Sequence, residues 1–297
     1  MVSVVICSIN KMLAAQVEKN IDETIGVPWQ LILTDNLQLN KGISWVYNQG
    51  AQQAQYDIVC FVHEDVLFQT PSWGRTIVSY FENNPQLGIV GVAGGKYKGR
   101  ALSGWWNGIP ATDCSNILYV DPQEKPARAF ANPDPSVKSQ DVVTVDGVFM
   151  CTPKKVWESV KFDESLIDGF HFYDIDFSFR ISRNYQAAVS YEIDILHLTR
   201  WGNFGDAWLE LALKWHARHK QQLPAMVNKD FIVSKMELRI YRNWLMRLKD
   251  ERISFGNKLK WIFSTAHWLN PLCWPHIGLF LFPKTGNRIS SLKGIRK

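Results

Sequence analysis

Short apolar runs alternate with amphipathic segments through the first two-thirds of the chain. Continuous runs rich in β-branched residues predict buried strands at about residues 2–7, 31–34, 58–62 and 88–92. Apolar positions at three- and four-residue steps predict helices at about 11–19, 43–54 and 71–83. Alternating strands and helices are typical of a mostly parallel sheet covered by helices on both faces. The pattern therefore predicts a Rossmann-like α/β fold.

The pattern changes after the fourth strand. Residues 96–140 are rich in Gly, Pro, Trp and Asn and show no periodicity, so we expect a long loop region over the site. Later elements are expected as a strand at 142–150, a helix opened by Thr152-Pro153, a helix from near Asp174 and strands within 187–197. From about residue 205 the chain is predicted to be helical. We expect an α/β domain over residues 1–225 and a helical extension over 226–297.

Composition narrows the class of protein. With 46% hydrophobic and 21% charged residues, the chain has enough apolar surface to build a core, which excludes a disordered protein. The five cysteines are scattered without a CxxC pair, which favours reduced thiols. The first ten residues lack a positively charged leader and a small-residue cleavage site, so we expect a cytoplasmic body.

The net charge of +5 is unevenly distributed. Residues 229–297 contain 14 Lys+Arg and four Asp+Glu, whereas residues 1–228 contain 19 Lys+Arg and 24 Asp+Glu. An acidic body argues against a nucleic-acid partner, because an enzyme acting on nucleic acid needs cations along its groove. A basic, aromatic tail instead favours an anionic membrane surface.

The tail itself has two parts. Residues 229–249 form a two-faced helical pattern, with apolar positions (Val233, Met236, Ile240, Trp244, Leu248) opposite basic ones (Lys235, Arg239, Arg242, Lys249). Residues 261–282 carry no formal charge, but Asn270-Pro271 and Pro275 interrupt them, which argues against a single spanning helix. Trp261, Trp268 and Trp274 suit the headgroup boundary, so we expect peripheral binding at the inner face of the plasma membrane. The alternative is a helical subdomain packed on the body or on another subunit.

The strongest local signal follows the third predicted strand. Its apolar run leads directly into His63-Glu64-Asp65. Carboxylate oxygens at a strand end suit Mg²⁺ or Mn²⁺, which often share their coordination with substrate phosphates. A solvated acidic turn explains the same residues equally well from spacing alone.

Several motifs together resemble the donor half of family 2 glycosyltransferases, which have a GT-A fold and use nucleotide-activated sugars. They are Ser8-Ile9-Asn10, Thr34-Asp35-Asn36, Asn48-Gln49-Gly50 and the triplet His63-Glu64-Asp65, where the family has Asp-x-Asp. The resemblance implies a donor site that includes Ser8, Asn10, Asn48 and Glu64, with Asp35 on the nucleoside base. It implies that Asp65 holds the metal that bridges the donor diphosphate. His63 replaces the first Asp, so either this imidazole supports the metal or Glu64 does, the other contacting the ribose.

The second half is similar to the acceptor segment of the same family. The matching motifs are Asp146-Gly147-Val148-Phe149-Met150, Phe162-Asp163-Glu164 and residues 169–180. The resemblance implies that Asp174 is the general base, since an acceptor hydroxyl must lose its proton to attack. Tyr173 stands where the family has Glu, and Asp146 and Tyr173 are expected beside the acceptor. Helix spacing pairs Asp176 with Arg180, whereas Asp174 could instead be a helix N-cap.

Three further sites have competing explanations. The resemblance implies that His197, after the last core strand, completes the metal site, although a lone buried His is more often structural. Arg200 could hold the diphosphate by two hydrogen bonds or be a surface cation. Trp105 and Trp106, in a glycine-flanked loop, suit stacking on a sugar ring or packing of the loop on the core.

The resemblance implies a metal-dependent, inverting transferase of hexosyltransferase type. It would move a sugar from a nucleotide-diphosphate donor to a hydroxyl of a glycan or lipid-linked glycan in bacterial surface-polysaccharide (lipopolysaccharide) assembly. The alternative is a non-catalytic protein that binds carbohydrate or nucleotide sugar on a degenerate GT-A fold. A nucleotidyltransferase is disfavoured because Ser8-Ile9-Asn10-Lys11 is not a glycine- and lysine-rich loop.

Overall fold

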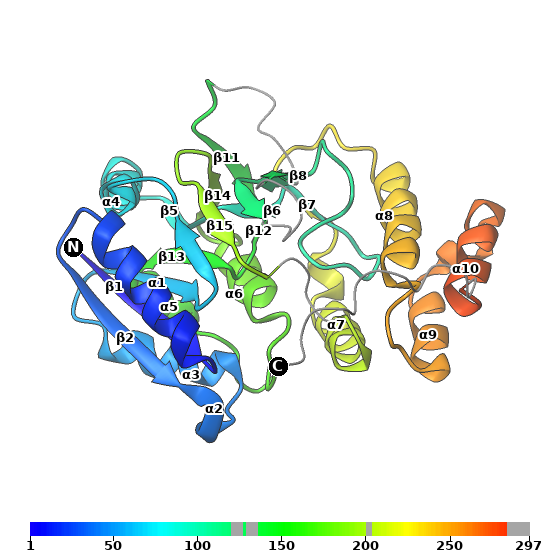
Figure 1. Ribbon diagram of the computed structural model, residues 1–297. Coiled ribbons are helices and arrows are strands. Elements are labelled where there is room, and N and C mark those ends of the chain that lie inside the picture. The colour runs from blue at the N-terminus through cyan, green and yellow to red at the C-terminus, as the bar shows by residue number, and fades with distance from the viewer. Residues whose placement is uncertain (120–126, 129–135, 200–203, 284–297) are drawn as a thin grey trace.

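The centre of the molecule is a seven-stranded sheet with the order β11-β14-β5-β13-β3-β1-β2 (Figure 1). The computed structural model describes residues 1–119, 127–128, 136–199 and 204–283. Strands β13 and β11 run antiparallel to their neighbours and the others share one direction, so the predicted mostly parallel α/β sheet is confirmed. The strands are β1 (Val2–Ser8), β2 (Trp29–Asp35), β3 (Ile58–His63), β5 (Leu87–Gly91), β11 (Ser139–Val142), β13 (Phe149–Pro153) and β14 (Gln186–Ser190).

Helices cover both faces of this sheet, which explains why its central strands are continuously apolar. In β1, Val4 and Ile6 pack with the face that carries α1 (Lys11–Thr24) and α4 (Trp73–Asn83). Val5 points to the opposite face, where it packs with residues of the remaining layer. The helices of that layer are α3 (Ile43–Gln53), α5 (Lys154–Val160) and α6 (Tyr173–Ile181).

Short strands β7, β8, β9 and β10 lie within the region expected to be loop. Together with short strands from other parts of the chain they form three small sheets, ordered β10-β9-β15-β4, β12-β6-β8 and β16-β7. These strands are β4 (Val66–Phe68), β6 (Ala93–Gly95), β7 (Tyr97–Lys98), β8 (Asp113–Ser115), β9 (Ile117–Tyr119), β10 (Ala127–Arg128), β12 (Thr144–Val145), β15 (Ile195–His197) and β16 (Ala225–Met226). The prediction of an unstructured loop over 96–140 is therefore partly wrong, because strands of two or three residues are too short to show a period of two.

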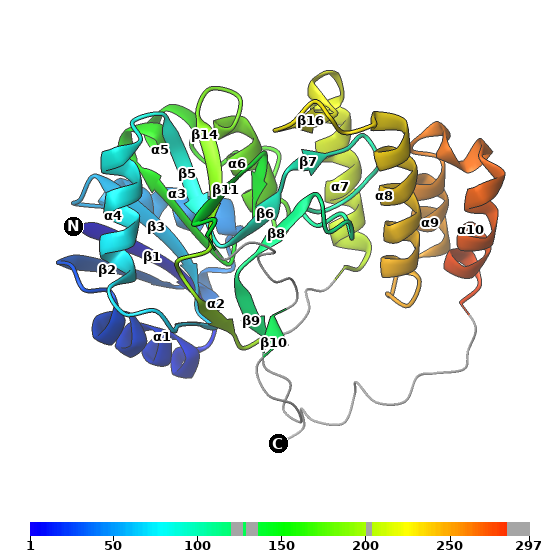
Figure 2. The ribbon, with the colours of Figure 1, turned by 90° about the horizontal axis from the view of Figure 1, so that it is seen from above.

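Beyond residue 205 the chain is largely helical and leads away from the sheet through α7, α8, α9 and α10 (Figure 2). The elements are α7 (Asp206–Arg218), η1 (Lys220–Gln222), α8 (Val233–Leu248), α9 (Phe255–Ile262), η2 (Ala266–Leu269), η3 (Pro271–Cys273) and α10 (Trp274–Leu281), η denoting a 3₁₀ helix. No helix among the described residues combines the length and apolar character needed to cross a bilayer.

The two-faced helix in the tail is α8, but its apolar face is buried. Ile240, Trp244 and Leu248 lie in one hydrophobic cluster with residues of the sheet and of α6 and α7. The indoles of Trp208 and Trp244 stack with ring centroids 4.8 Å apart. Trp261, expected at a headgroup boundary, is also fully buried. This core continues across residues 225 and 226, and the domain boundary there stays a prediction.

Candidate active site

Two strands bring three metal-ligating side chains to one edge of the sheet. β3 ends at His63, Asp65 follows in the turn to β4, and β15 pairs with β4 and ends at His197. One ligand atom from each of these residues lies within 4.8 Å of the others. His197 Nε2 is 3.2 Å from Asp65 Oδ2, and His63 Nδ1 is 4.0 Å from Asp65 Oδ1. The structure thus brings together the three residues expected at the metal.

Burial and neighbouring charges shift the pKa values of Asp65 and His63 towards the forms that bind a metal ion. Burial alone would raise the pKa of Asp65, but its hydrogen bond to His197 and the neighbouring imidazoles hold that pKa below the usual range. Burial lowers the pKa of His63, which favours the neutral ring. The Tyr173 hydroxyl lies 2.5 Å from His63 Nε2, so this contact leaves Nδ1 directed to Asp65. One carboxylate and two imidazoles suit a divalent transition ion such as Mn²⁺ better than Mg²⁺.

Glu64 joins the triplet to the end of β1. Its Oε2 accepts hydrogen bonds from Ser8 Oγ at 2.6 Å, Ile9 N at 3.2 Å and Asn10 N at 3.0 Å. The Asn10 side chain caps α1 by accepting from the amides of Met12 and Leu13. Ser8, Asn10 and Glu64, all expected to contact the donor, therefore form one hydrogen-bonded group, in which Glu64 fixes the loop after β1.

The other expected donor residues occupy different surroundings. Asp35 ends β2 opposite Ser8 in the sheet and caps the short helix α2 (Asn36–Leu39), so it lies at the same edge. Asn48 does not: it is buried in α3, where its side-chain nitrogen donates to Phe162 O and Glu164, and its oxygen accepts from Trp157 Nε1 and Phe162 N. These bonds use the capacity of its amide inside the protein and give it a structural role. Arg200 lies outside the described residues.

Two carboxylates stand beside the metal-ligating cluster. Asp174 Oδ2 accepts from Gly147 N at 3.0 Å, while Asp146 Oδ1 accepts from Val148 N at 2.8 Å. The N-cap of α6 is Phe172, so the alternative of Asp174 as the N-cap is wrong. Burial and the nearby charge of Asp146 raise the pKa of Asp174 to about 7. A carboxyl with such a pKa is suited to accept a proton near neutral pH.

Gly147 lies where the segments that form the site approach each other most closely. A Cβ at this position would lie 2.0 Å from the Tyr173 hydroxyl and 3.0 Å from Asp174 Cβ. His63 N donates to Val148 O at 3.1 Å, which ties the same segment to β3. The absence of a side chain here lets Asp146, Tyr173 and His63 approach one another. The sequence motif contains this glycine, but its role becomes visible only when the structure shows that segments remote in the chain approach each other here.

The loop that carries the two tryptophans is held by the C-terminal extension. Trp105 donates to Asp146 through its indole nitrogen. Trp106 packs its ring edge-on against Trp244 and accepts from Trp244 Nε1 at 2.9 Å through its carbonyl. Trp105 is therefore beside the acidic pair, whereas Trp106 packs on α8.

Three further polar groups, two of them buried, hold this loop in place, and sequence reasoning missed them. Lys98 Nζ, fully buried, donates to Ser103 O at 2.6 Å, Ser103 Oγ at 2.9 Å and Gly104 O at 3.0 Å. The buried Glu237 of α8 accepts from Tyr97, Arg100 and Ala101, and Asn243 donates to Asn107 O and Gly108 O. A charged side chain that is buried usually has specific polar partners. The sequence does not show that Lys98 and Glu237 are buried, so it could not reveal these contacts.

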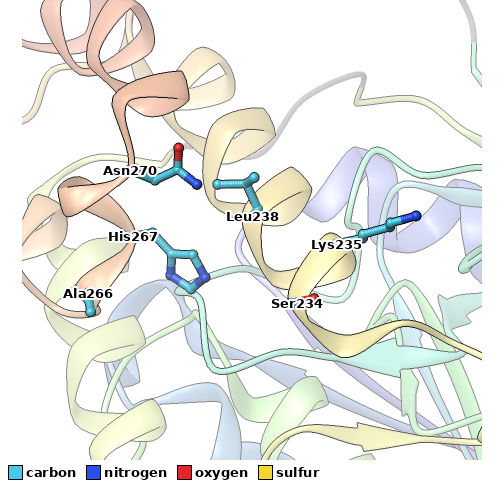
Figure 3. Close-up of a pocket in the computed structure, with 6 residues that line it drawn as sticks. All are labelled: Ser234, Lys235, Leu238, Ala266, His267 and Asn270. Carbon is cyan, nitrogen blue, oxygen red and sulfur yellow. The ribbon is translucent and has the colours of Figure 1, made fainter.

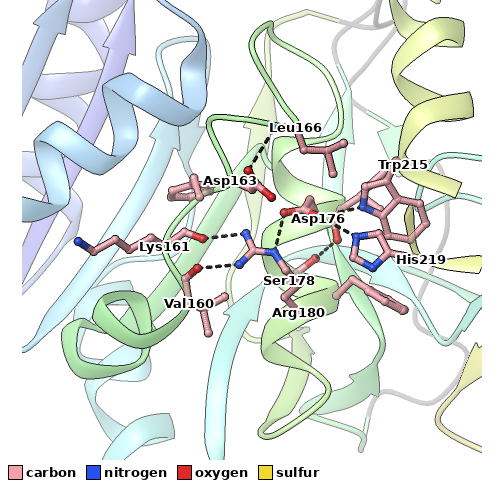
Figure 4. A network of polar contacts seen from close by, with 12 residues as sticks. Val160, Lys161, Asp163, Leu166, Asp176, Ser178, Arg180, Trp215 and His219 are labelled. Atoms are coloured by element: carbon pink, nitrogen blue, oxygen red, sulfur yellow. Dashed lines mark hydrogen bonds and ion pairs between the residues drawn. The ribbon is translucent and has the colours of Figure 1, made fainter. Parts of the chain in front are cut away.

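Asp176 belongs to a separate, structural network (Figure 4). Its carboxylate pairs with Arg180 Nε at 2.7 Å and accepts from Trp215 Nε1 at 3.1 Å, and it also lies 3.1 Å from His219 Nε2. Arg180 in turn donates to the carbonyls of Val160 and Lys161, after α5. The expected pairing of Asp176 with Arg180 is confirmed, and this aspartate anchors α6 to α5 and α7.

A mostly parallel sheet covered by helices on both faces is the architecture of GT-A glycosyltransferases. The chain belongs to the glycosyltransferase-like family, whose model matches residues 3–208. No curated protein is similar enough in sequence to count as a relative.

Solved structures of S. aureus TarS share the fold at low identity. TarS of S. aureus is 11% identical, with a TM-score of 0.52, over 89% of this chain and 47% of its own. A structure of TarS 1–349 in complex with UDP is 12% identical, with a TM-score of 0.51, over 90% of this chain and 80% of its own. GalNAc-T7, crystallised with UDP, GalNAc and Mn²⁺, matches 68% of this chain and 43% of its own at 11% identity and a TM-score of 0.48. The chain thus spans less than half the length of TarS and of GalNAc-T7.

Proposed function

We propose that this protein is a metal-dependent, inverting glycosyltransferase that moves a hexose from a nucleotide-diphosphate sugar to an acceptor hydroxyl. The observation that carries the proposal is the convergence of His63, Asp65 and His197 beside Asp146 and Asp174. These residues come from segments far apart in the chain and meet at one edge of the sheet, where ligands of open α/β sheets bind.

The residues divide the chemistry between them. Asp65, His197 and His63 would hold a divalent ion, which supplies positive charge for the departing diphosphate. Asp174 accepts the proton of the acceptor hydroxyl as that oxygen attacks the anomeric carbon from the side opposite the leaving group. Asp146 raises the pKa of this base and orients the Trp105 indole, which offers a flat face to the sugar. Asp35 and the loop after β1 line the nucleotide side.

We propose a glycan or lipid-linked glycan of the bacterial surface as the acceptor, with the protein bound peripherally to the cytoplasmic face of the membrane. The support is the excess of Lys and Arg in residues 229–297, where they number 14 against four acids. UDP, bound in the TarS complex, is the first nucleotide to test on this chain.

Ligand-induced stabilisation tests the proposal, since a ligand that binds only the native state raises its melting temperature. We expect Mn²⁺ together with UDP to raise the melting temperature of the intact protein, and Asp65→Ala and His197→Ala to lose this shift. Asp174→Asn is the matched variant, because it leaves the ligand set intact and should keep the shift while losing turnover of the UDP-sugar. A shift that survives Asp65→Ala contradicts the metal site. Binding without turnover of any nucleotide sugar supports the non-catalytic alternative.

A further inference from the structure

Five large apolar side chains lie exposed together at the end of the extension. Phe263, Trp268, Leu269, Leu272 and Trp274 are 56%, 37%, 60%, 61% and 60% exposed; we name this set the aromatic edge. Three of its members are in contact: the rings of Phe263 and Trp268 meet edge-on at 5.2 Å, and Trp274 Nε1 donates to Trp268 O at 3.0 Å. Leu269 and Leu272 lie between Trp268 and Trp274 in the sequence. Scattered apolar side chains are ordinary on a surface, but a contiguous group marks a contact with another molecule.

The fold holds this edge firmly from behind. Trp261, Cys273 and Phe280 are buried on the inner side of the same elements, and the Trp261 ring stacks on Tyr241 at 4.8 Å. The Asn270 side chain accepts from Leu272 N and so caps η3. The inward positions therefore supply the packing that these short elements need. Packing within the described chain gives no reason for the outward positions to be apolar.

An open groove of about 410 Å³ continues the apolar surface between α8 and residues 266–270. Figure 3 shows the Leu238 side chain and the His267 ring facing the gap, with the Lys235 side chain directed away from it. The groove extends the aromatic edge towards α8, and Lys235 is the charged residue in its lining. It is lined by Ser234, Lys235, Leu238, Ala266, His267 and Asn270.

The surroundings of the edge are cationic. Residues 226–283 contain nine Lys or Arg and four acids. Of the acids, Glu237 is buried, while Asp250 and Glu251 pair with Lys249 and Arg247. Arg242 contacts His276 of α10, beside the edge, at 3.3 Å. A surface that joins indoles and leucines to uncompensated cations complements a bilayer with anionic headgroups.

We propose that the aromatic edge is the membrane-contacting surface and that it inserts into the headgroup region of a bilayer rich in anionic phospholipid. This inference rests on the proposed membrane association, but it assigns the contact to a different part of the extension from the apolar face of α8. The apolar face of α8 is occupied by the body, so contact is made by the turns η2 and η3 and the start of α10. Indole rings favour this depth because they combine an apolar body with a polar N–H.

Vesicle co-sedimentation of the full chain tests the proposal. Wild-type protein is expected to bind vesicles of equal parts phosphatidylglycerol and phosphatidylcholine and to bind pure phosphatidylcholine much more weakly. Leu272→Asp and Trp274→Ser should each lower partitioning about tenfold, because each removes one large apolar side chain from the contact. The matched control is Leu37→Asp, since Leu37 is 62% exposed in α2 and lies outside the edge. It should bind like wild type.

Each outcome has a defined meaning. Edge variants that keep the wild-type melting temperature and still bind like wild type overturn the aromatic edge but leave membrane association standing. If wild-type protein does not bind anionic vesicles, both the aromatic edge and membrane association are overturned. The transferase proposal is decided separately, by the changes in melting temperature with Mn²⁺ and UDP. A concentration-dependent dimer that Leu272→Asp dissociates, with no vesicle binding, identifies a second copy as the occupant and overturns the proposal. Melting curves of all variants exclude misfolding as the cause.

Discussion

At the scale of single residues, the proposed mechanism gives different tasks to two neighbouring carboxylates. Asp174 lies beside Asp146, and both are held by backbone amides of the segment that contains Gly147. Burial and the charge of Asp146 give Asp174 a pKa of about 7. The unprotonated form of Asp174 is the one that can accept a proton, so the fraction of competent protein increases as pH rises through this value.

The pH dependence of turnover tests this arrangement. We expect kcat/KM for a UDP-sugar to rise with pH and to level off above about pH 7. Asp146→Asn removes the neighbouring negative charge, so the pKa of Asp174 falls and the acid limb moves to lower pH, whatever happens to the maximal rate. Glu158→Gln, an exposed change in α5, is the control and should leave the limb in place. An acid limb that does not move in Asp146→Asn contradicts the coupling.

At the scale of elements, patterns within one segment were predictable and contacts between distant segments were not. The apolar runs of β1, β3 and β5 predict the central sheet, and the triplet at residues 63–65 predicts a ligand site at its edge. By contrast, the hydrogen bonds between Glu237 and the segment at β7 join residues about 140 apart in the chain. It places an acid on the buried side of α8, against the apolar pattern from which that helix was predicted. Sequence periodicity describes the average character of a face, so a single buried charge with specific partners escapes it.

Glu237 therefore gives a prediction at this scale. Glu237→Ala leaves the Tyr97 hydroxyl and the amides of Arg100 and Ala101 without their acceptor, which should lower the free energy of unfolding by about 3 kcal/mol. Urea unfolding measures the loss. Glu251→Ala is the control: Glu251 follows the same helix and pairs with Arg247, so this change should cost less than about 1 kcal/mol. If the two variants lose the same stability, α8 does not hold the loop as described.

At the scale of the whole molecule, the extension is part of the body's core. Trp244 stacks on Trp208, its indole nitrogen binds the carbonyl of Trp106, and Trp106 neighbours the Trp105 that contacts Asp146. The extension that exposes the aromatic edge on η2, η3 and α10 thus also holds, through α8, the loop whose Trp105 contacts Asp146. A helical tail and a catalytic body can be recognised separately in sequence, but their shared core comes from aromatic packing across the boundary between them.

Truncation tests that shared core. A chain ending at residue 225 loses α8 and leaves Trp208, Tyr97 and the loop of Trp106 without their covering side chains. Because such a loss exposes apolar rings and buried hydrogen-bonding groups at once, we expect the truncated chain to aggregate or to unfold without a cooperative transition. A chain ending at Pro283 keeps α8 to α10 and is the control for shortening as such. Differential scanning calorimetry distinguishes the cases. A cooperative transition of the 1–225 chain near the wild-type temperature would show that the body folds independently, and residues 226–297 would then be a separate domain.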